Sequence, residues 1–199
     1  MKILVIGATG EIGRAVVKEL ASRHDIVEAS RSNSQHQVDM ADAASIQNLF
    51  HKVGPVDAVV SAAGDAHFGP LATMTMDQFQ VGIRGKLLGQ IQLALIAQHL
   101  LADRGSITLT SGVLSTDPIV AGANASTVNA GIDGFVRAAA IEMPRGIRIN
   151  AVSPTILVES LPKYGPYFRG FEAVSVSRAA LAYSKSVEGA QTGQIYSVT

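Results

Sequence analysis

Residues 1–20 read MKILVIGATGEIGRAVVKEL, and this stretch decides the fold. Ile3–Ile6 is an apolar run without a polar residue, which is typical of a parallel strand buried on both faces. Glycines follow at positions 7, 10 and 13, and apolar residues then recur at helical spacing as far as Leu20. The order of strand, glycine-rich turn and helix predicts a mononucleotide-binding unit.

The three glycines have separate expected tasks. Gly7 permits the tight turn, Gly10 lets the backbone approach a phosphate, and Gly13 lets the helix pack close to the strand. The helix N-terminus offers unpaired N–H groups and a positive dipole end to a pyrophosphate. The alternative is a turn that joins strand to helix and binds no ligand. The expected cofactor contacts of this unit are Gly7, Thr9, Gly10, Glu11, Ile12 and Gly13.

Composition limits the class of protein. A length of 199 residues suits one well-filled α/β core and is short for two, so we expect a single domain over residues 1–199. The 16 basic and 16 acidic residues balance and form no run of like charge, which argues against a nucleic-acid or membrane surface. The absence of cysteine excludes disulfides and thiolate catalysis, and it fits a reducing compartment.

Targeting and metal signals are also lacking. Met1 leads directly into the first strand, so we expect no signal peptide. No uncharged apolar run reaches the roughly 18 residues of a membrane span, so we expect a cytoplasmic protein. The five histidines show no metal-ligand spacing with carboxylates, and no metal site is predicted.

Strand-like and helix-like segments alternate along the rest of the chain. The predicted strands after the first are 25–29, 37–39, 55–60, 106–110, 147–150 and 194–198. The predicted helices after the first are 42–53, 75–102, 123–142 and 174–188. This alternation predicts an α/β fold of three layers, a doubly wound Rossmann-type parallel sheet with helices on both faces.

Several stretches together resemble the short-chain dehydrogenase/reductase family, and the resemblance covers essentially the whole chain. They are GATGEIG at 7–13, VDM at 38–40, SAAG at 61–64, GIRINAVSP at 146–154 and TGQIYSV at 192–198. The resemblance implies about seven strands, NAD(P)(H) across their carboxyl edge, and hydride transfer between alcohols and carbonyls. Residues 156–171 leave only a small segment to cover the substrate.

The residues after the second strand bear on the choice of nucleotide. A site for NAD has an acidic residue about 20 positions beyond the glycines, where this chain has Ser30, Arg31 and Ser32. A guanidinium and two hydroxyls suit a 2′-phosphate, and the same motif in the family implies NADP(H). Arg14 could add a second charge. The competing signal is Glu28, because a two-residue slip of the strand end would favour NAD(H).

The resemblance implies further cofactor contacts. Asp39 resembles the family's adenine-contacting carboxylate, although it could equally cap the following helix. Gly64 would let the chain pass close to the adenine ribose, while the family's usual asparagine is Ala62 in this chain. The remaining expected contacts are Met40, Ala63, Asn129 and Pro154.

The resemblance breaks at the family's active residues. There a tyrosine moves the proton at the carbonyl oxygen, a lysine lowers its pKa and holds the nicotinamide ribose, a serine bonds the substrate oxygen, and an asparagine anchors a water. This chain carries Ala125 at the tyrosine position, Asn129 at the lysine, Gly112 at the serine and Lys86 at the asparagine. No tyrosine is followed by lysine at the fourth place.

An altered catalytic site is therefore predicted. Lys86 is the first candidate, as proton donor or oxyanion partner, because partial burial would lower its pKa; otherwise it is a surface lysine. Ser111 is the second, since a one-residue shift of the loop could bring it to the substrate oxygen; otherwise it caps the strand end. His67, in a loop near the nicotinamide end, is the third.

Two functions follow. The first is an NADP(H)-dependent oxidoreductase that acts on a small carbonyl or alcohol through Lys86 and Ser111. The second is an NADP(H)-binding protein with little or no turnover, which acts as a sensor or interaction partner. In either case a homodimer or homotetramer is expected through the predicted helices 75–102 and 123–142, whose many small residues and leucines suit packing against a symmetry mate.

Overall fold

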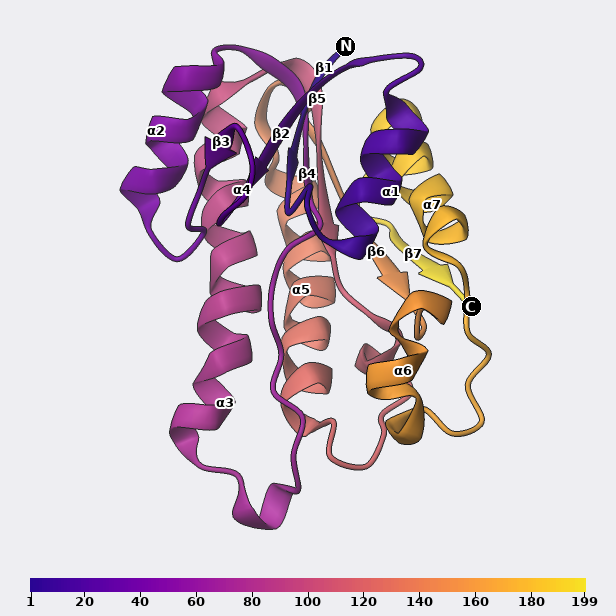
Figure 1. Cartoon of the computed structure of the whole chain (residues 1–199). Helices are drawn as coiled ribbons and strands as arrows, with labels where there is room; N and C mark the ends of the chain where they lie inside the picture. Colours follow the sequence, from indigo (N-terminus) through magenta and orange to yellow (C-terminus); the bar gives the residue numbers. More distant parts are fainter.

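The computed structural model describes residues 1–199 and is built on a seven-stranded parallel sheet (Figure 1). The strands lie in the order β3-β2-β1-β4-β5-β6-β7. This order confirms the predicted doubly wound α/β fold. In chain order the strands are β1 (Lys2–Ile6), β2 (Asp25–Ser30), β3 (His36–Gln37), β4 (Val56–Ser61), β5 (Leu101–Thr110), β6 (Arg148–Pro154) and β7 (Ile195–Val198).

Helices cover both faces of the sheet, with α2, α4 and α5 on one face and α1 and α7 on the other (Figure 1). The α-helices are α1 (Glu11–Leu20), α2 (Ala43–Val53), α3 (Met76–Gly82), α4 (Gly89–Leu100), α5 (Ala123–Glu142), α6 (Leu161–Tyr164) and α7 (Val176–Glu188). Shorter turns of 3₁₀-helix are η1 (Leu71–Thr73), η3 (Val113–Ser115), η4 (Pro144–Gly146), η5 (Val158–Ser160) and η6 (Gly165–Tyr167).

The first strand shows how two cores arise from one apolar run. Ile3 and Val5 point into the cluster under α1 and α7, whereas Leu4 and Ile6 point into the cluster under α2, α4 and α5. Successive side chains of a strand face opposite sides of the sheet, so a strand covered on both faces needs no polar alternation. Because β1 is covered on both faces, its sequence from Ile3 to Ile6 is apolar at every position.

Several predicted boundaries move by a few residues. The strand predicted at 106–110 already begins at Leu101, and the one predicted at 147–150 continues to Pro154. Helix α2 is capped by Asp42, whose side chain accepts from the backbone N–H of Ala44. The alternative role of Asp39 as the cap of this helix is therefore wrong.

The helix predicted over 75–102 runs without a break from Met76 to Leu100, but its middle part is π-helical, and this is the main correction to the predicted elements. Between α3 and α4 the chain forms a π-helical segment, η2 (Ile83–Leu88), and α4 ends at Leu100. Glycines at 82, 85 and 89 lower the helix propensity of this stretch, so the wider turn costs little. Such π-turns are frequent at functional sites, and this one carries Lys86.

No helix is long and apolar enough to cross a membrane. Two leucines of the η2 and α4 region, Leu88 and Leu95, are about half exposed, at 50% and 52%. The predicted assembly through these helices stays a prediction.

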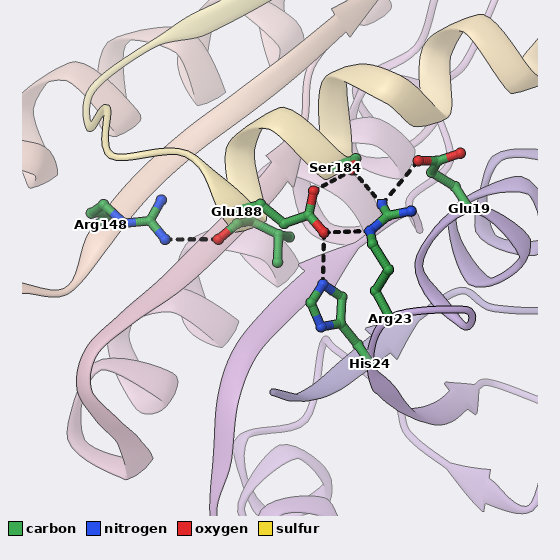
Figure 2. Close-up of polar contacts among 7 residues, drawn as sticks. Glu19, Arg23, His24, Arg148, Ser184 and Glu188 are labelled. Carbon is green, nitrogen blue, oxygen red and sulfur yellow. Dashed lines mark hydrogen bonds and ion pairs between the residues drawn. The ribbon is translucent and has the colours of Figure 1, made fainter.

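A polar cluster joins the C-terminal ends of α1 and α7 (Figure 2). Glu188 accepts from Arg23 Nε at 2.8 Å and from Ser184 at 2.9 Å, and His24 Nε2 lies 2.8 Å from it. Arg23 also binds Glu19 at 3.0 Å. These bonds, with that of Arg23 first, lower the pKa of Glu188 from its ordinary 4.5 to about 2.

We expect this cluster to stabilise the fold only while Glu188 is ionised. Because the folded-state pKa lies below the unfolded one, its contribution is present above about pH 4.5 and is lost as the pH falls towards 2. Water screens the partly exposed pair, so Glu188→Gln should lower the free energy of unfolding by about 1 kcal/mol at pH 7 and by almost nothing near pH 2. Urea unfolding at both pH values measures this. Exposed Glu142→Gln is the control, and an equal loss for Glu188→Gln at both pH values would contradict the prediction.

Candidate functional site

The glycine-rich turn lies at the carboxyl edge of the sheet, between the ends of β1, β2 and β4. Gly7 has a positive φ of 82°, and a Cβ atom there would lie 2.6 Å from the carbonyl oxygen of Ala62. The N–H groups of Gly7 and Ala8 donate to the carbonyl of Ala29 at 2.8 and 3.2 Å. A Cβ atom at Gly13 would lie 2.0 Å from the Gly7 oxygen, so α1 packs directly on the turn. These contacts agree with the tasks predicted for both glycines.

The N-terminus of α1 has no side-chain cap. Its N-cap residue is Gly10, so the N–H groups of the first turn have no side-chain acceptor there. Arg14 folds back and donates to the carbonyl of Thr9. Glu11 points to the covering segment, where it accepts from Ser160 at 2.6 Å. The helix end is thus open to an anion, with Thr9, Glu11 and Ile12 around it.

The end of β2 places three predicted residues beside the turn. Ser30 is buried and donates to the carbonyl of Ser32 at 2.6 Å, which holds the turn between them. The side chain of Arg31 is 81% exposed and lies 3.7 Å from Asp65, a loose surface pair. Glu28 is paired in register with Val5 inside the strand, so the two-residue slip that would bring it to the site does not occur.

The stretch at 38–40 and the end of β4 have mainly structural contacts. Asp39 accepts from the N–H of Ala41 at 2.9 Å. Met40 belongs to the core, and its carbonyl accepts from Gln92 at 2.9 Å. Ala62 donates to the carbonyl of Ile6 at 2.8 Å, and Ala63 packs against the same core. Met40, Ala62 and Ala63 therefore offer a ligand mainly their backbone, whereas the carboxylate of Asp39 stays exposed.

Lys86 is held by the chain at a defined point beside β5. Its Nζ atom donates to the carbonyl of Ser111 at 2.9 Å and to Asn129 Oδ1 at 2.6 Å. The stem of the side chain lies on Gly64, where a Cβ atom would be 2.7 Å from Lys86 Cγ and where φ is 134°. An ammonium has three N–H donors, so one remains for a ligand.

The surroundings of Lys86 favour a reactive amine. Burial lowers its pKa from 10.5 to about 8, and the charge of Asp133 partly offsets this shift. Asn129 and Asp133 are each only 4% exposed on α5, and Asp133 Oδ1 has no hydrogen-bond partner. The alternative of a surface lysine is therefore wrong for Lys86.

Lys86 and Asn129 exchange the two side chains of the resembled family. That family keeps its asparagine on the long helix before β5 and its lysine on the helix after β5. This chain has Lys86 on the first of these, in η2, and Asn129 on the second, α5. The contact at 2.6 Å keeps one ammonium and one amide together at the same place. The phenol has no replacement at this position, since the side chain of Ala125 is a methyl group without a hydroxyl.

A cavity of about 240 Å³ lies beside Lys86, and five of the predicted site residues line it. They are Gly64, Lys86, Ser111, Asn129 and Pro154. Ser111 is buried, and its hydroxyl donates to the carbonyl of Asn129 at 3.4 Å, a long bond. His67 does not line the cavity, and its ring lies against Gly69.

The prediction missed the aromatic wall of the cavity. Phe68, Tyr164 and Phe168 line it from the loop after β4 and from the segment between β6 and α7. The only local signal was the density of aromatic residues within 156–171, a segment predicted merely to cover the substrate.

Comparison with known proteins shows similarity along the whole chain. A family model described as enoyl-(acyl carrier protein) reductase matches residues 4–192. L-xylulose reductase from Mesocricetus auratus is 29% identical over 178 residues, which cover 80% of this chain and 73% of that protein. The crystal structure of the protein lin1944 from Listeria innocua has 47% identity and a TM-score of 0.98, with 100% of both chains covered. A small-chain dehydrogenase in complex with NADPH has 26% identity and a TM-score of 0.88, covering 100% of this chain and 96% of that one.

The effect of the Asp133 charge on the pKa of Lys86 can be measured. We expect Asp133→Asn to lower the pKa of Lys86 further below 8, because the substitution removes the negative charge that raises it. The measurement is the pH titration of the Lys86 side-chain NMR signals. Asp117→Asn, on an exposed loop, should leave the titration unchanged. A pKa that stays at about 8 in Asp133→Asn would refute the coupling.

Proposed function

The chain belongs to the short-chain dehydrogenase/reductase family, and from this premise we propose that it is an NADP(H)-dependent oxidoreductase acting on a small carbonyl or alcohol through an altered site. The observation that carries the proposal is the ammonium of Lys86, which the fold holds in the cavity beside Asn129. The dehydrogenase structure in complex with NADPH supports the choice of cofactor.

The residues at the carboxyl edge fit a dinucleotide. The uncapped N-terminus of α1 and the close turn at Gly7 would hold the pyrophosphate. Arg31, exposed directly after β2, would bind a 2′-phosphate because its pair with Asp65 is loose. Asp39, Met40, Ala62 and Ala63 would border the adenosine side, and Asn129 and Pro154 the nicotinamide side. Gly64, expected at the adenine ribose, lies against Lys86 in the cavity, so we propose it for the nicotinamide side as well. NADP(H), when bound, supplies or accepts the hydride.

Lys86 performs the proton step in this proposal. Its third N–H points to the oxygen of a carbonyl substrate, and its charge stabilises the negative charge that develops there. The ammonium then gives its proton to this oxygen, and the resulting amine takes a new proton from water. A pKa of about 8 suits a group that must be protonated at neutral pH and must also release its proton. The hydroxyl of Ser111 is proposed as a second donor to the same oxygen, which requires its single O–H to leave the long bond to the carbonyl of Asn129.

A second function has a specific observation in its favour. Ala125 and Gly112 replace the family's phenol and hydroxyl, and neither residue can move a proton. A chain with these substitutions could bind NADP(H) without turnover and act as a sensor or interaction partner. The absence of turnover over a broad panel of carbonyls and alcohols, with nucleotide binding retained, would favour this function.

Nucleotide binding is the first test. We expect the protein to bind NADPH at least about tenfold more tightly than NADH, a difference of about 1.4 kcal/mol. Arg31→Ala should abolish this preference, because it removes the cation for the 2′-phosphate, whereas Arg137→Ala, exposed on α5, should keep it. Titration calorimetry measures both constants. Binding of neither nucleotide would exclude both proposed functions.

Turnover should depend on the protonated form of Lys86. We expect the rate of carbonyl reduction to be constant below about pH 8 and to fall about tenfold for each further pH unit. Lys86→Met should lower kcat by about 100-fold or more while NADPH still binds, since the stem on Gly64 is kept. Lys52→Met, exposed on α2, is the control. Full activity in Lys86→Met would remove Lys86 from the mechanism.

A further inference from the structure

The aromatic residues of this chain are concentrated around one cavity. The chain has six phenylalanines, four tyrosines and no tryptophan, and only Phe50 and Tyr183 of these are buried in the two large cores. Five of the others gather at the cavity and its rim. They are Phe68, Tyr164, Tyr167, Phe168 and Phe171.

The rings support one another in the geometry of aromatic pairs. Tyr164 stands 5.3 Å from Phe68 between ring centroids, at an angle of 43°, and Tyr167 stands 6.0 Å from Phe68 on the rim. Phe168 meets Phe171 edge to face at 5.4 Å. In Figure 1 the α6 region that carries Tyr164 lies beyond the carboxyl ends of β6 and β7. A ligand ring that enters here would join an existing aromatic cluster.

The remaining wall of the cavity is mixed: aliphatic residues form part of it, and Ser111, Asn129 and Thr155 add neutral polar groups. Val113, Leu114 and Ala125 form a small buried cluster against which Phe68 and Phe168 pack. Lys86 is the one cation that lines the cavity, and Asp65 is the one carboxylate. A flat ring can therefore lie against the aromatic and aliphatic side of the cavity while a hydrogen-bond acceptor on it faces Lys86.

The volume limits the ligand further. About 240 Å³ lies below the roughly 300–1,000 Å³ of pockets for drug-sized molecules. The proposed function also assigns the side of Gly64 and Pro154 to the nicotinamide, which leaves room for one substituted ring.

We propose that this cavity binds a small aromatic ketone or aldehyde, with its ring against Tyr164 and Phe68 and its oxygen at Lys86 Nζ. The inference rests on the proposed function for the place of the nicotinamide. It makes Tyr164 a residue that determines specificity, whereas the proton step stays with Lys86.

A matched pair of ketones tests the aromatic preference. Acetophenone and cyclohexyl methyl ketone have almost the same size, and only the first has an aromatic ring. We expect the protein to bind acetophenone about tenfold more tightly, measured by ligand-observed NMR titration with and without NADP⁺. Tyr164→Leu should lose this preference and Tyr164→Phe should keep it. Tyr167→Leu, which touches Phe68 from the rim without lining the cavity, should also keep it.

The outcomes separate this inference from the proposed function. Equal binding of the two ketones, or binding of neither, overturns the aromatic site even if NADPH binds and other carbonyls are reduced. A preference for acetophenone that Tyr164→Leu retains also overturns it. If the protein binds acetophenone selectively but binds no nucleotide, the aromatic site stands and the proposed oxidoreductase falls. Circular dichroism of each variant verifies that it is folded.

Discussion

The close approach of backbone to backbone at the glycine-rich turn is the constraint on which the other features depend. A side chain at Gly7 would strike the end of β4, and one at Gly13 would strike the turn itself. Because both Cβ atoms are missing, α1 starts directly over the carboxyl edge and packs with α7 against the same face of the sheet. The open helix end, the Arg31 loop and the cavity beside Lys86 are all arranged around this edge.

A second set of interactions connects the carboxyl edge of the sheet with the core. Gln90 is fully buried, and its amide binds both the N–H and the carbonyl of Thr110 at 2.8 and 2.9 Å. The Thr110 hydroxyl bonds the carbonyl of Ser61 and the phenol of Tyr183, whose pKa is raised by burial. Buried polar groups are costly unless each is satisfied. This network therefore holds the end of β5, and with it the Ser111 carbonyl that positions Lys86.

The cavity beside Lys86 differs from the family's usual pattern in its side chains, on the same doubly wound fold. The ammonium now comes from the π-helical segment and the amide from α5, and their contact keeps a cation at the floor of the cavity. The alanine at position 125 leaves an apolar wall where the related family has a phenol. In the proposed function, the polar end and the aromatic mouth would together receive a small ligand whose acceptor oxygen faces Lys86.

The sequence by itself determined the order of elements, the glycine turn and Arg31 at the end of β2, because these features are encoded in local periodicity and short motifs. Lys86 became the leading catalytic candidate through the resemblance to a known family, whose asparagine position it occupies. Only the tertiary structure decided that Lys86 meets Asn129 and Ser111, which are 43 and 25 positions away. The register of β2 that excludes Glu28 from the site and the contact of Phe68 with Tyr164 likewise depend on packing between distant segments. Such contacts depend on how helices and loops pack against the sheet, and no local sequence pattern specifies them.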